Sequence, residues 1–362
     1  MNTGMWVILT GSAPVLVCYS SYFYYERGTS EMSPSILAPS ETEQHQQVSS
    51  QLLHWIDQFK EATSQGKCAD YIPALGNMNP HQLGVTVIGT DGTMITAGDC
   101  EAPFTLQSIS KVLSLVAVCI EYGIPHVLQR VDAEPTGDAF NSIIRLEMSK
   151  PGRPYNPMIN AGAITVSSML AGDSVAQKMS SLNKLFIQLI GTAPVLNEEV
   201  FESEWNTAHR NRALAYYLKD IGFLDGDVEG ALEVYLKQCA LEVTTKDTAL
   251  IGLILALDGY HPIRQEQVIP KDVARFTKSL MLTCGMYNAS GKFAAFVGVP
   301  TKSGVSGGIL SAVPPRYRSR DLPFADGCGI GIFSPSIDEV GNSVAGSLLL
   351  KEMAQQWDLS IF

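Results

Sequence analysis

The chain has 362 residues, 46% of them hydrophobic, which is enough to bury a large core shared between one big domain and a companion. Its formal net charge of -11 comes without any tract rich in Lys and Arg. Nucleic acids and anionic membrane surfaces need positive charge to meet their phosphates, so both are excluded as main partners. We expect a small-molecule partner.

The cysteines and histidines indicate the redox compartment and bear on metal binding. The seven cysteines are scattered, odd in number and never spaced C-x-x-C. This pattern favours free thiols in a reducing compartment and predicts a cytoplasmic protein. The six histidines form no H-x-x-x-H or H-x-H pair, so we expect no metal site.

Residues 1–48 differ in composition from the rest of the chain. The apolar stretch 5–25 carries no charge, as a signal or membrane segment would, but it lacks a basic start and Pro14 interrupts it. A stretch rich in Ser, Pro, Glu and Gln follows at 30–47, a composition typical of disorder. We interpret 1–48 as a disordered or dispensable leader, and leave open a weak membrane anchor and an export signal.

From residue 49 the hydrophobic pattern is regular. Apolar residues at helical spacing predict a helix over 49–66, and alternation on both sides of Asp91-Gly92 predicts a two-stranded hairpin over 83–99. The period is then mostly helical from about 105 to 282. The end of the chain predicts three strands and a closing amphipathic helix, over 293–300, 306–314, 328–335 and 342–357 respectively.

The order of these elements predicts an α+β fold. When both ends of a region supply strands and its middle is helical, the economical arrangement is an antiparallel sheet flanked by helices with an inserted all-helical domain. We assign 49–362 to one catalytic domain, with a sheet part (49–105 and 283–362) and a helical part (106–282). The cleft between the two parts is the default site.

The first chemical signal is the S-x-x-K pattern that Ser108 and Lys111 form in "LQSISKV". Residues i and i+3 share one face of a helix, so the lysine can reach the serine hydroxyl. Lysine can activate a serine only when neutral, and burial against neighbours such as Leu106 and Leu115 lowers its pKa. The alternative is a lysine that snorkels out of a core helix beside a serine that only packs.

Several segments in one order resemble the glutaminases of the serine-dependent β-lactamase-like group. The likeness runs from about Cys68 to Ala345 and rests on "ADYIPALG", "LQSISKV", "EPTGDAFNSI", "NPMINAGAI", "SEWNTAHRNRALA", "VYLKQCALEVT", "TCGMYNASGKFAAFVGVPTKSGVSGGI" and "FSPSIDEVGNSVAG". Two local departures stand out: Asp132 replaces the usual glycine, and "LALDGYHP" lacks the usual Ala-Asn-Gly-Gly. The resemblance implies a fold like that of β-lactamases and penicillin-binding proteins.

The same resemblance implies hydrolysis of L-glutamine to L-glutamate and ammonia, with no cofactor, by a homodimer or homotetramer. Ser108 would be the nucleophile and Lys111 its base, and the N–H groups of Ser108 and Val305 would form an oxyanion hole. Glycines in "KSGVSGGI" permit the close backbone approach that such a site needs.

Six further residues match the family's substrate contacts. Glu204 and Asn211 would hold the α-amino acid end of the substrate; they lie seven residues apart, which places both on one face of a helix. The other matches are Tyr71, Asn160, Tyr235 and Tyr287. Tyr287 would lie at the reacting centre, and whether Tyr287 or Lys111 protonates the leaving ammonia stays open. Lys302 of "KSG" could add positive charge near the site, but exposed lysines are usually only solvated, so we leave it out of the catalytic residues.

Two rival functions share some of these features. A β-lactamase or transpeptidase would share S-x-x-K and K-[ST]-G but needs an S-D-N tripeptide, which this chain lacks. A protein that only binds an amino acid or scaffolds an oligomer would not need the nucleophile and the base, and both are present.

Overall fold

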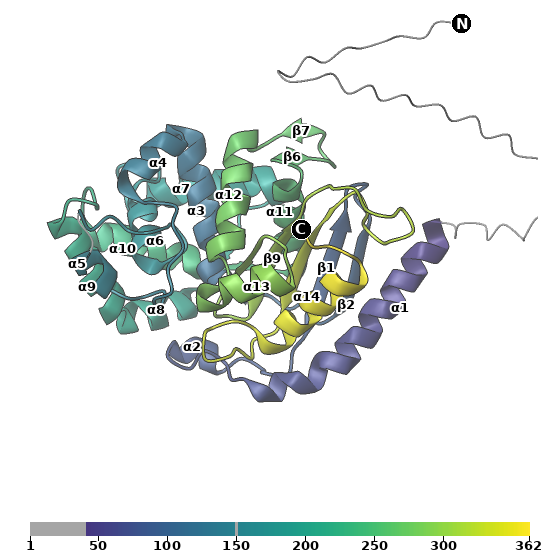
Figure 1. Cartoon of the computed structure of the whole chain (residues 1–362). Coiled ribbons are helices and arrows are strands. Elements are labelled where there is room, and N and C mark those ends of the chain that lie inside the picture. Colours follow the sequence, from purple (N-terminus) through teal and green to yellow (C-terminus); the bar gives the residue numbers. More distant parts are fainter. Residues whose placement is uncertain (1–40, 149–150) are drawn as a thin grey trace, which may run out of the picture. The chain divides into compact units, whose positions relative to one another are not determined.

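The structure is a computed structural model that describes residues 41–148 and 151–362. Figure 1 labels most of its elements. The helices are α1 (Glu41–Lys60), α2 (Pro73–Gly76), α3 (Ser110–Tyr122), α4 (Ile124–Arg130), α5 (Ile144–Met148), α6 (Asn160–Ser168), α7 (Val175–Ile190), α8 (Glu198–Thr207), α9 (His209–Asp220), α10 (Val228–Cys239), α11 (Thr245–Ala256), α12 (Lys271–Cys284), α13 (Ser290–Phe296) and α14 (Val344–Gln356). Short 3₁₀ turns are η1 (Glu61–Gln65), η2 (Gln107–Ile109) and η3 (Tyr287–Ala289).

A five-stranded antiparallel sheet joins the two ends of the described chain. Its order is β2-β1-β10-β9-β8, with bounds β1 (Gly84–Gly89), β2 (Met94–Gly98), β8 (Thr301–Ser303), β9 (Gly308–Val313) and β10 (Cys328–Phe333). The predicted hairpin is confirmed as β1 and β2, whose turn contains Gly92 at φ +86°. The prediction that both ends supply strands to one sheet is also confirmed, because β1 pairs with β10.

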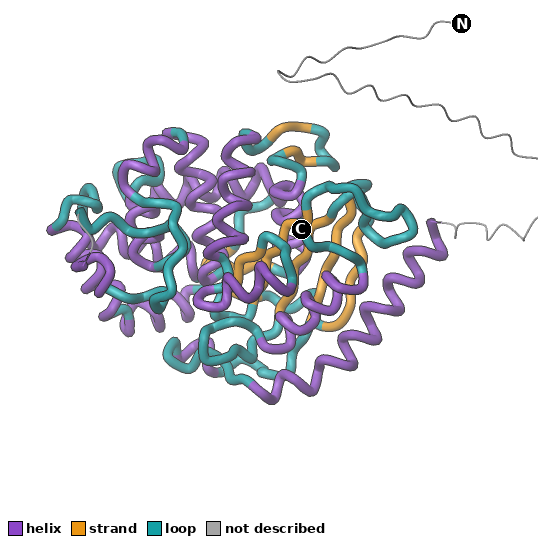
Figure 2. Tube along the Cα trace, viewed as in Figure 1, coloured by secondary structure: helices purple, strands orange, loops and turns teal. Residues whose placement is uncertain are grey.

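Helices cover both faces of this sheet (Figure 2). On one face, Val85, Val87 and Ile332 pack into an apolar cluster with α1 and α14. The alternate residue Ile88 turns to the other face and packs against Ala249 and Leu253 of α11. This period-two alternation buries both faces, so the strands read as apolar throughout.

Glycines let α11 lie close to the middle of the sheet. A Cβ atom on Gly329 of β10 would come within 1.9 Å of the Ala249 carbonyl oxygen, and one on Gly331 within 2.0 Å of the Thr245 oxygen. On the helix side, a Cβ on Gly252 would lie 2.2 Å from the Ser311 oxygen. The alternating glycines of "CGIGIF" therefore set the distance between helix and sheet.

Three local predictions differ from the structure. The first helix begins at Glu41, earlier than the predicted 49, and its residue Val48 is buried in the core. The rest of the predicted leader, 1–40, lies outside the described residues. The strand predicted over 293–300 is wrong, since 290–296 is helix α13. Its two alanines favour helix, and the chain resumes as β8 only after Pro300.

The helical part is not all-helical, which corrects the third prediction. It contains the short strands β4 (Val195–Leu196), β5 (Leu241–Val243), β6 (Tyr260–His261) and β7 (Glu266–Gln267). Strand β5 pairs with β4 and with β3 (Phe104–Thr105), so a second small sheet joins the helical part to the segment that leads into α3. Helix α11 also packs on the main sheet, so the two parts share one core.

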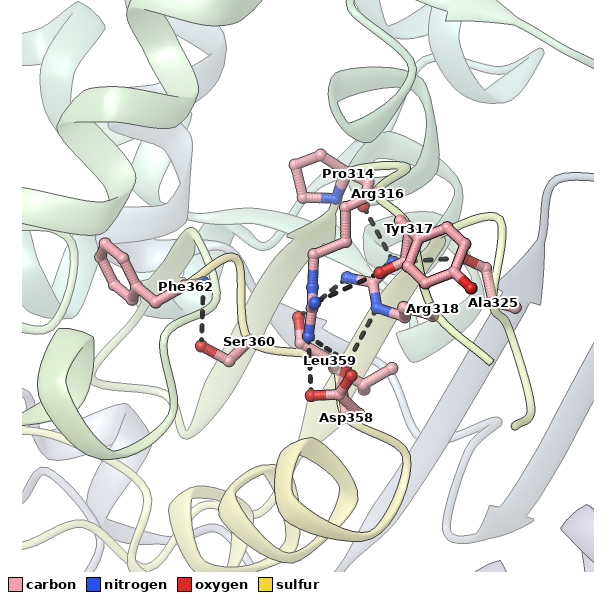
Figure 3. Close-up of polar contacts among 9 residues, drawn as sticks. All are labelled: Pro314, Arg316, Tyr317, Arg318, Ala325, Asp358, Leu359, Ser360 and Phe362. Atoms are coloured by element: carbon pink, nitrogen blue, oxygen red, sulfur yellow. Dashed lines mark hydrogen bonds and ion pairs between the residues drawn. The ribbon is translucent and has the colours of Figure 1, made fainter. Parts of the chain in front are cut away.

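The loop between β9 and β10 is fixed to the C-terminal end of the chain (Figure 3). Arg318 is almost fully buried and donates hydrogen bonds to the carbonyl oxygens of Asp358 at 2.8 Å and Leu359 at 3.2 Å. Arg316 pairs with the Asp358 carboxylate at 2.7 Å. These bonds hold the loop that joins β9 to the central strand β10.

Within the described residues, no single helix is both long and apolar enough to cross a membrane. A bent pair, Gln107–Tyr122 with Ile124–Arg130, meets that test jointly on length and composition.

Candidate active site

One cavity of about 220 Å³ gathers most of the predicted site residues. Those that line it are Tyr71, Ser108, Asn160, Glu204, Asn211, Tyr235 and Val305. They come from widely separated parts of the sequence. The remaining two predicted residues do not line the cavity but contact residues that do: Lys111 bonds to Asn160, and Tyr287 shares an apolar cluster with Val305. The fold therefore brings the predicted residues to one place.

Ser108 is held at the entrance to α3 by the small sheet. Strand β3 pairs with β5, and the Leu106 N–H continues this pairing by donating to the Leu241 oxygen at 2.9 Å. The chain then turns sharply: Gln107 has φ +46°, unusual for a residue with a side chain, and Ser108 lies in a 3₁₀ turn. Backbone strain of this kind persists where surrounding structure imposes it, often at active sites.

Ser108 and Lys111 lie on either side of the junction between the 3₁₀ turn η2, which ends at Ile109, and helix α3. Lys111, in the first turn of α3, is fully buried, which contradicts the alternative of a snorkelling lysine. Its Nζ donates to Asn160 Oδ1 at 2.7 Å and to the Met158 oxygen at 3.2 Å.

Burial makes Lys111 a suitable proton acceptor. It lowers the pKa of the ammonium to about 8, against smaller opposing effects from Cys239 and Glu204. At pH 7 about a tenth of such a lysine is neutral, far more than of an exposed lysine. Asn160 also connects Lys111 to Asn211, because its Nδ2 donates to Asn211 Oδ1 at 2.9 Å.

The seven-residue spacing predicted that Glu204 and Asn211 share one face of a single helix. In the structure they reach the cavity from two helices. Helix α8 ends at Thr207 and α9 begins at His209, so the chain bends between them. The Glu204 carboxyl is buried, and burial raises its pKa to about 7, partly offset by a 3.4 Å hydrogen bond from Gln107 Nε2. A cation entering the cavity would restore the charge of this carboxylate.

Tyr287 occupies a strained position next to the nucleophile. It has φ +50° in η3, and its hydroxyl donates to the Ser303 oxygen at 3.3 Å and is hydrogen-bonded to the Ser108 side chain. Burial raises the pKa of the phenol. Gly341 lies against the ring, where a Cβ atom would come within 3.3 Å.

The other two tyrosines differ in exposure. Tyr235, on α10, is buried, and its ring centroid lies 5.9 Å from Lys111 Nζ. Burial raises the pKa of the Tyr235 phenol well above its usual range, so it is a neutral hydrogen-bonding group. Tyr71 is 55% exposed and lies at the rim of the cavity.

Val305 reaches the cavity on a glycine turn between β8 and β9. A Cβ on Gly304 would lie 2.6 Å from the Leu106 oxygen, so the turn touches the segment that carries Ser108. Gly307 has φ +94°, and Ser306 Oγ donates to the Thr105 oxygen at 2.6 Å. These contacts agree with the close backbone approach predicted for the "KSGVSGGI" segment.

Several lining residues were missed by sequence reasoning, among them Gln107, Phe140, Asn141, Arg210 and Cys239. Some signals were present: Gln107 and Arg210 directly precede predicted residues, and Cys239 follows Tyr235 by four positions on α10, which places both on one helix face. Phe140 and Asn141 belong to a loop whose place the sequence pattern does not indicate.

Of the two interpretations of Lys302, the solvated lysine is wrong. Its side chain is fully buried, and its Nζ lies 4.5 Å from the centroid of the Tyr287 ring. Position 302 is the middle of β8, where the strand residues are all buried.

Among the described ranges, no group of three or more His, Cys, Asp or Glu side chains is placed to hold a metal ion. The six cysteines in these ranges, Cys68, Cys100, Cys119, Cys239, Cys284 and Cys328, are free thiols. The side chains that line the cavity offer the Ser108 hydroxyl, a carboxylate, amides, phenols, the Arg210 guanidinium and the Cys239 thiol.

Comparison with known proteins assigns the chain to a family. A family model described as Glutaminase matches residues 66–362. "Glutaminase 1" of Bacillus subtilis (strain 168) is 65% identical over 312 residues, covering 86% of this chain and 95% of that protein.

Solved structures agree with the sequence matches. The crystal structure of a Bacillus subtilis probable glutaminase aligns with a TM-score of 0.83 and 62% identity, over 87% of this chain and 98% of that one. Another, a covalent complex of a Bacillus subtilis glutaminase with 5-oxo-L-norleucine formed from 6-diazo-5-oxo-L-norleucine, aligns with a TM-score of 0.79 and 59% identity, over 87% and 99% of the two chains. The chain belongs to the glutaminase family of hydrolases.

Proposed function

We propose that the protein hydrolyses the side-chain amide of L-glutamine to L-glutamate and ammonia through an acyl-enzyme on Ser108. The observation that carries this proposal is the arrangement of one cavity, in which a serine on a strained turn faces a buried carboxylate, Glu204, while the low-pKa Lys111 bonds to Asn160 of the cavity lining. An amino acid with a short side-chain amide suits this arrangement, because its α-ammonium can pair with Glu204 while its amide reaches Ser108.

Substrate binding would use the polar groups around Glu204. The α-ammonium of glutamine pairs with the Glu204 carboxylate, which the bound cation returns to its charged form. The amide groups of Asn160 and Asn211 and the phenols of Tyr71 and Tyr235 supply hydrogen bonds to the remaining polar atoms. This leaves the side-chain amide of the substrate directed toward Ser108.

In the acylation step, neutral Lys111 takes the proton of Ser108 while Oγ attacks the amide carbon. The backbone N–H groups of Ser108 and Val305 stabilise the oxyanion of the tetrahedral intermediate. The carbon–nitrogen bond then breaks, and the nitrogen leaves as ammonia with a proton from Lys111 or from the Tyr287 phenol. Water attacks the acyl-enzyme by the same route in reverse and releases glutamate.

The finer description of the fold is part of this proposal. We infer a β-lactamase-like arrangement, because S-x-x-K stands at the start of α3 and K-S-G ends the edge strand β8 beside it. A homodimer or homotetramer and a cytoplasmic location are proposed on the family resemblance and on the free thiols.

Covalent labelling tests the nucleophile and the substrate class together. The protein is incubated with a diazo ketone analogue of glutamine, and the intact mass and the labelled peptide are measured by mass spectrometry. The proposal predicts one label on Ser108 and none in Ser108→Ala. Ammonia release from L-glutamine is compared with hydrolysis of a chromogenic β-lactam, and activity on the β-lactam alone would favour the rival function.

A further inference from the structure

Lys302 is a buried lysine that the proposed mechanism does not use. It occupies the middle of the edge strand β8, opposite Leu310 of β9, and its side chain is fully buried. Its Nζ donates to the Ser303 oxygen at 2.6 Å and to the Gly285 oxygen at 3.0 Å. No carboxylate of the described ranges forms an ion pair with it, so its environment differs from that of an ordinary buried salt bridge.

The remaining side of the Lys302 amine faces Tyr287. Nζ lies 4.5 Å from the centroid of the Tyr287 ring, within the range of a cation–π contact. An ammonium has three donors, and here two carbonyl oxygens and one aromatic face surround it. The two carbonyl oxygens and the Tyr287 ring are thus the contacts that hold the amine in place.

Lys302 and Tyr287 also compete for one acceptor. The Ser303 oxygen accepts the 2.6 Å bond from Lys302 and the longer 3.3 Å bond from the Tyr287 hydroxyl. Because the bond from Lys302 is much the shorter of the two, the phenol is held weakly there. The same hydroxyl is hydrogen-bonded to the Ser108 side chain.

A second set of bonds fixes the backbone of this joint. The Gly285 oxygen accepts from Lys302 and also from the Ser303 N–H at 3.2 Å. Gly285 has no room for a side chain, since a Cβ atom there would lie 1.8 Å from the Thr301 oxygen. The strand end and the turn that places Tyr287 at positive φ are therefore clamped together.

Other charged or titratable groups also face this joint. Burial, followed by repulsion from Lys111, lowers the pKa of Lys302, whereas Cys284 and Cys239 act in the opposite direction. Cys239 and Asp338 raise the pKa of the Tyr287 phenol in addition to the larger effect of burial. Variants at position 302 are therefore compared at one pH, so that the protonation of these neighbouring groups does not vary with the assay conditions.

We propose that Lys302 is a positioning residue for Tyr287: it occupies the Ser303 carbonyl and supports the ring, so that the phenol is directed to Ser108. This inference rests on the proposed function. It concerns how the phenol is oriented for the proton transfers around Ser108 and adds no chemical step.

Removing the amine should redirect the phenol. In Lys302→Met the Ser303 oxygen keeps only the Tyr287 hydroxyl as donor, and the Gly285 oxygen keeps the Ser303 N–H. No buried carbonyl loses its last partner, so the fold is expected to survive. The phenol then bonds to the Ser303 oxygen more tightly and is less available for proton transfer at Ser108.

The test is a double-mutant cycle measured as ammonia release from L-glutamine. We expect Lys302→Met to lower kcat by about 10- to 100-fold, part of a typical acid–base contribution, with KM within about threefold of wild type because Lys302 does not line the cavity. Tyr287→Phe keeps the ring but removes the hydroxyl. In that background Lys302→Met should lower kcat by no more than about threefold further.

Lys278→Met is the matched control. Lys278 is also buried and bonded, to the Ala256 oxygen at 3.1 Å and to Asp258 at 2.7 Å, but lies outside the site. It should lower the melting temperature and leave kcat unchanged. If Lys302→Met melts below the assay temperature, Lys302→Gln, which keeps an N–H donor without the charge, is measured by the same criteria.

The outcomes separate this inference from the proposed function. A wild-type protein inactive on glutamine would overturn the function itself. With an active wild type, the role of Lys302 is refuted if the single variant keeps kcat within threefold, if its loss lies in KM, or if the two substitutions lower kcat independently. Independent losses would identify Lys302 as a structural lysine only.

Discussion

Replacing Lys111 with arginine tests the proposed base. Arginine keeps the positive charge, the long stem and several donors, but its guanidinium does not release a proton at neutral pH. Lys111 is fully buried with a pKa of about 8, so the neutral form is accessible to lysine alone. The variant should therefore retain a cation beside Asn160 and lose the base.

The structure sets the size of both effects. The lowering of the lysine pKa from 10.5 to about 8 corresponds to about 3 kcal/mol of environment acting against the charged form. Arginine must stay charged there, and its larger side chain adds about 1–3 kcal/mol of overpacking. We expect a folded protein with a melting temperature lowered by several degrees, and activity lowered by about 100-fold or more.

The assay is ammonia release from L-glutamine between pH 6 and 9, with melting curves on the same samples. Lys111→Met, which keeps the stem and removes the charge, is measured beside it. A base predicts that both variants are nearly inactive, whereas a structural cation predicts that only the methionine variant is. Activity of Lys111→Arg within about tenfold of wild type across this range would refute the reasoning.

Three further predictions concern other parts of the molecule. Glu204→Gln removes the charge that faces the substrate ammonium, so KM should rise by about tenfold or more with a smaller change in kcat, and a loss confined to kcat would contradict the assignment. In the wild type, kcat should rise between pH 6.5 and 9, because the neutral form of Lys111 appears as pH passes its lowered pKa of about 8; a flat profile would count against this base. Gly329→Ala should lower the melting temperature by about 5 °C or more, since its Cβ meets a backbone oxygen of α11, while Gly291→Ala on α13, with nothing within 4 Å, should be neutral or stabilising.

Local patterns in the sequence were sufficient for much of the sheet. The hairpin over 83–99 and the strands within 306–314 and 328–335 were predicted from alternation and turn residues, and the structure confirms them. The S-x-x-K pattern and the family's segments likewise identified residues that meet in one cavity. Such signals are local, because each depends on the spacing of neighbouring residues.

Other features depended on segments far apart in the chain. The run 293–300 is apolar enough for either a strand or a helix, and its packing decides in favour of α13. Glu204 and Asn211 have the spacing of one helix but lie on two, because the chain bends at Ala208. A short apolar run or a seven-residue spacing does not specify which long-range contacts will form.

Lys302 illustrates the same limit for the site. The segment "TKSGV" has the composition of a solvated strand end. Lys302 is buried beneath Tyr287 only because β8 pairs with β9 and the Gly285 turn approaches it. The sequence by itself determined the chemical groups, the strand alternation and the family. The tertiary structure decided which of those groups lose contact with water, and burial in a low-dielectric interior is what shifts the pKa of a lysine or a carboxyl group.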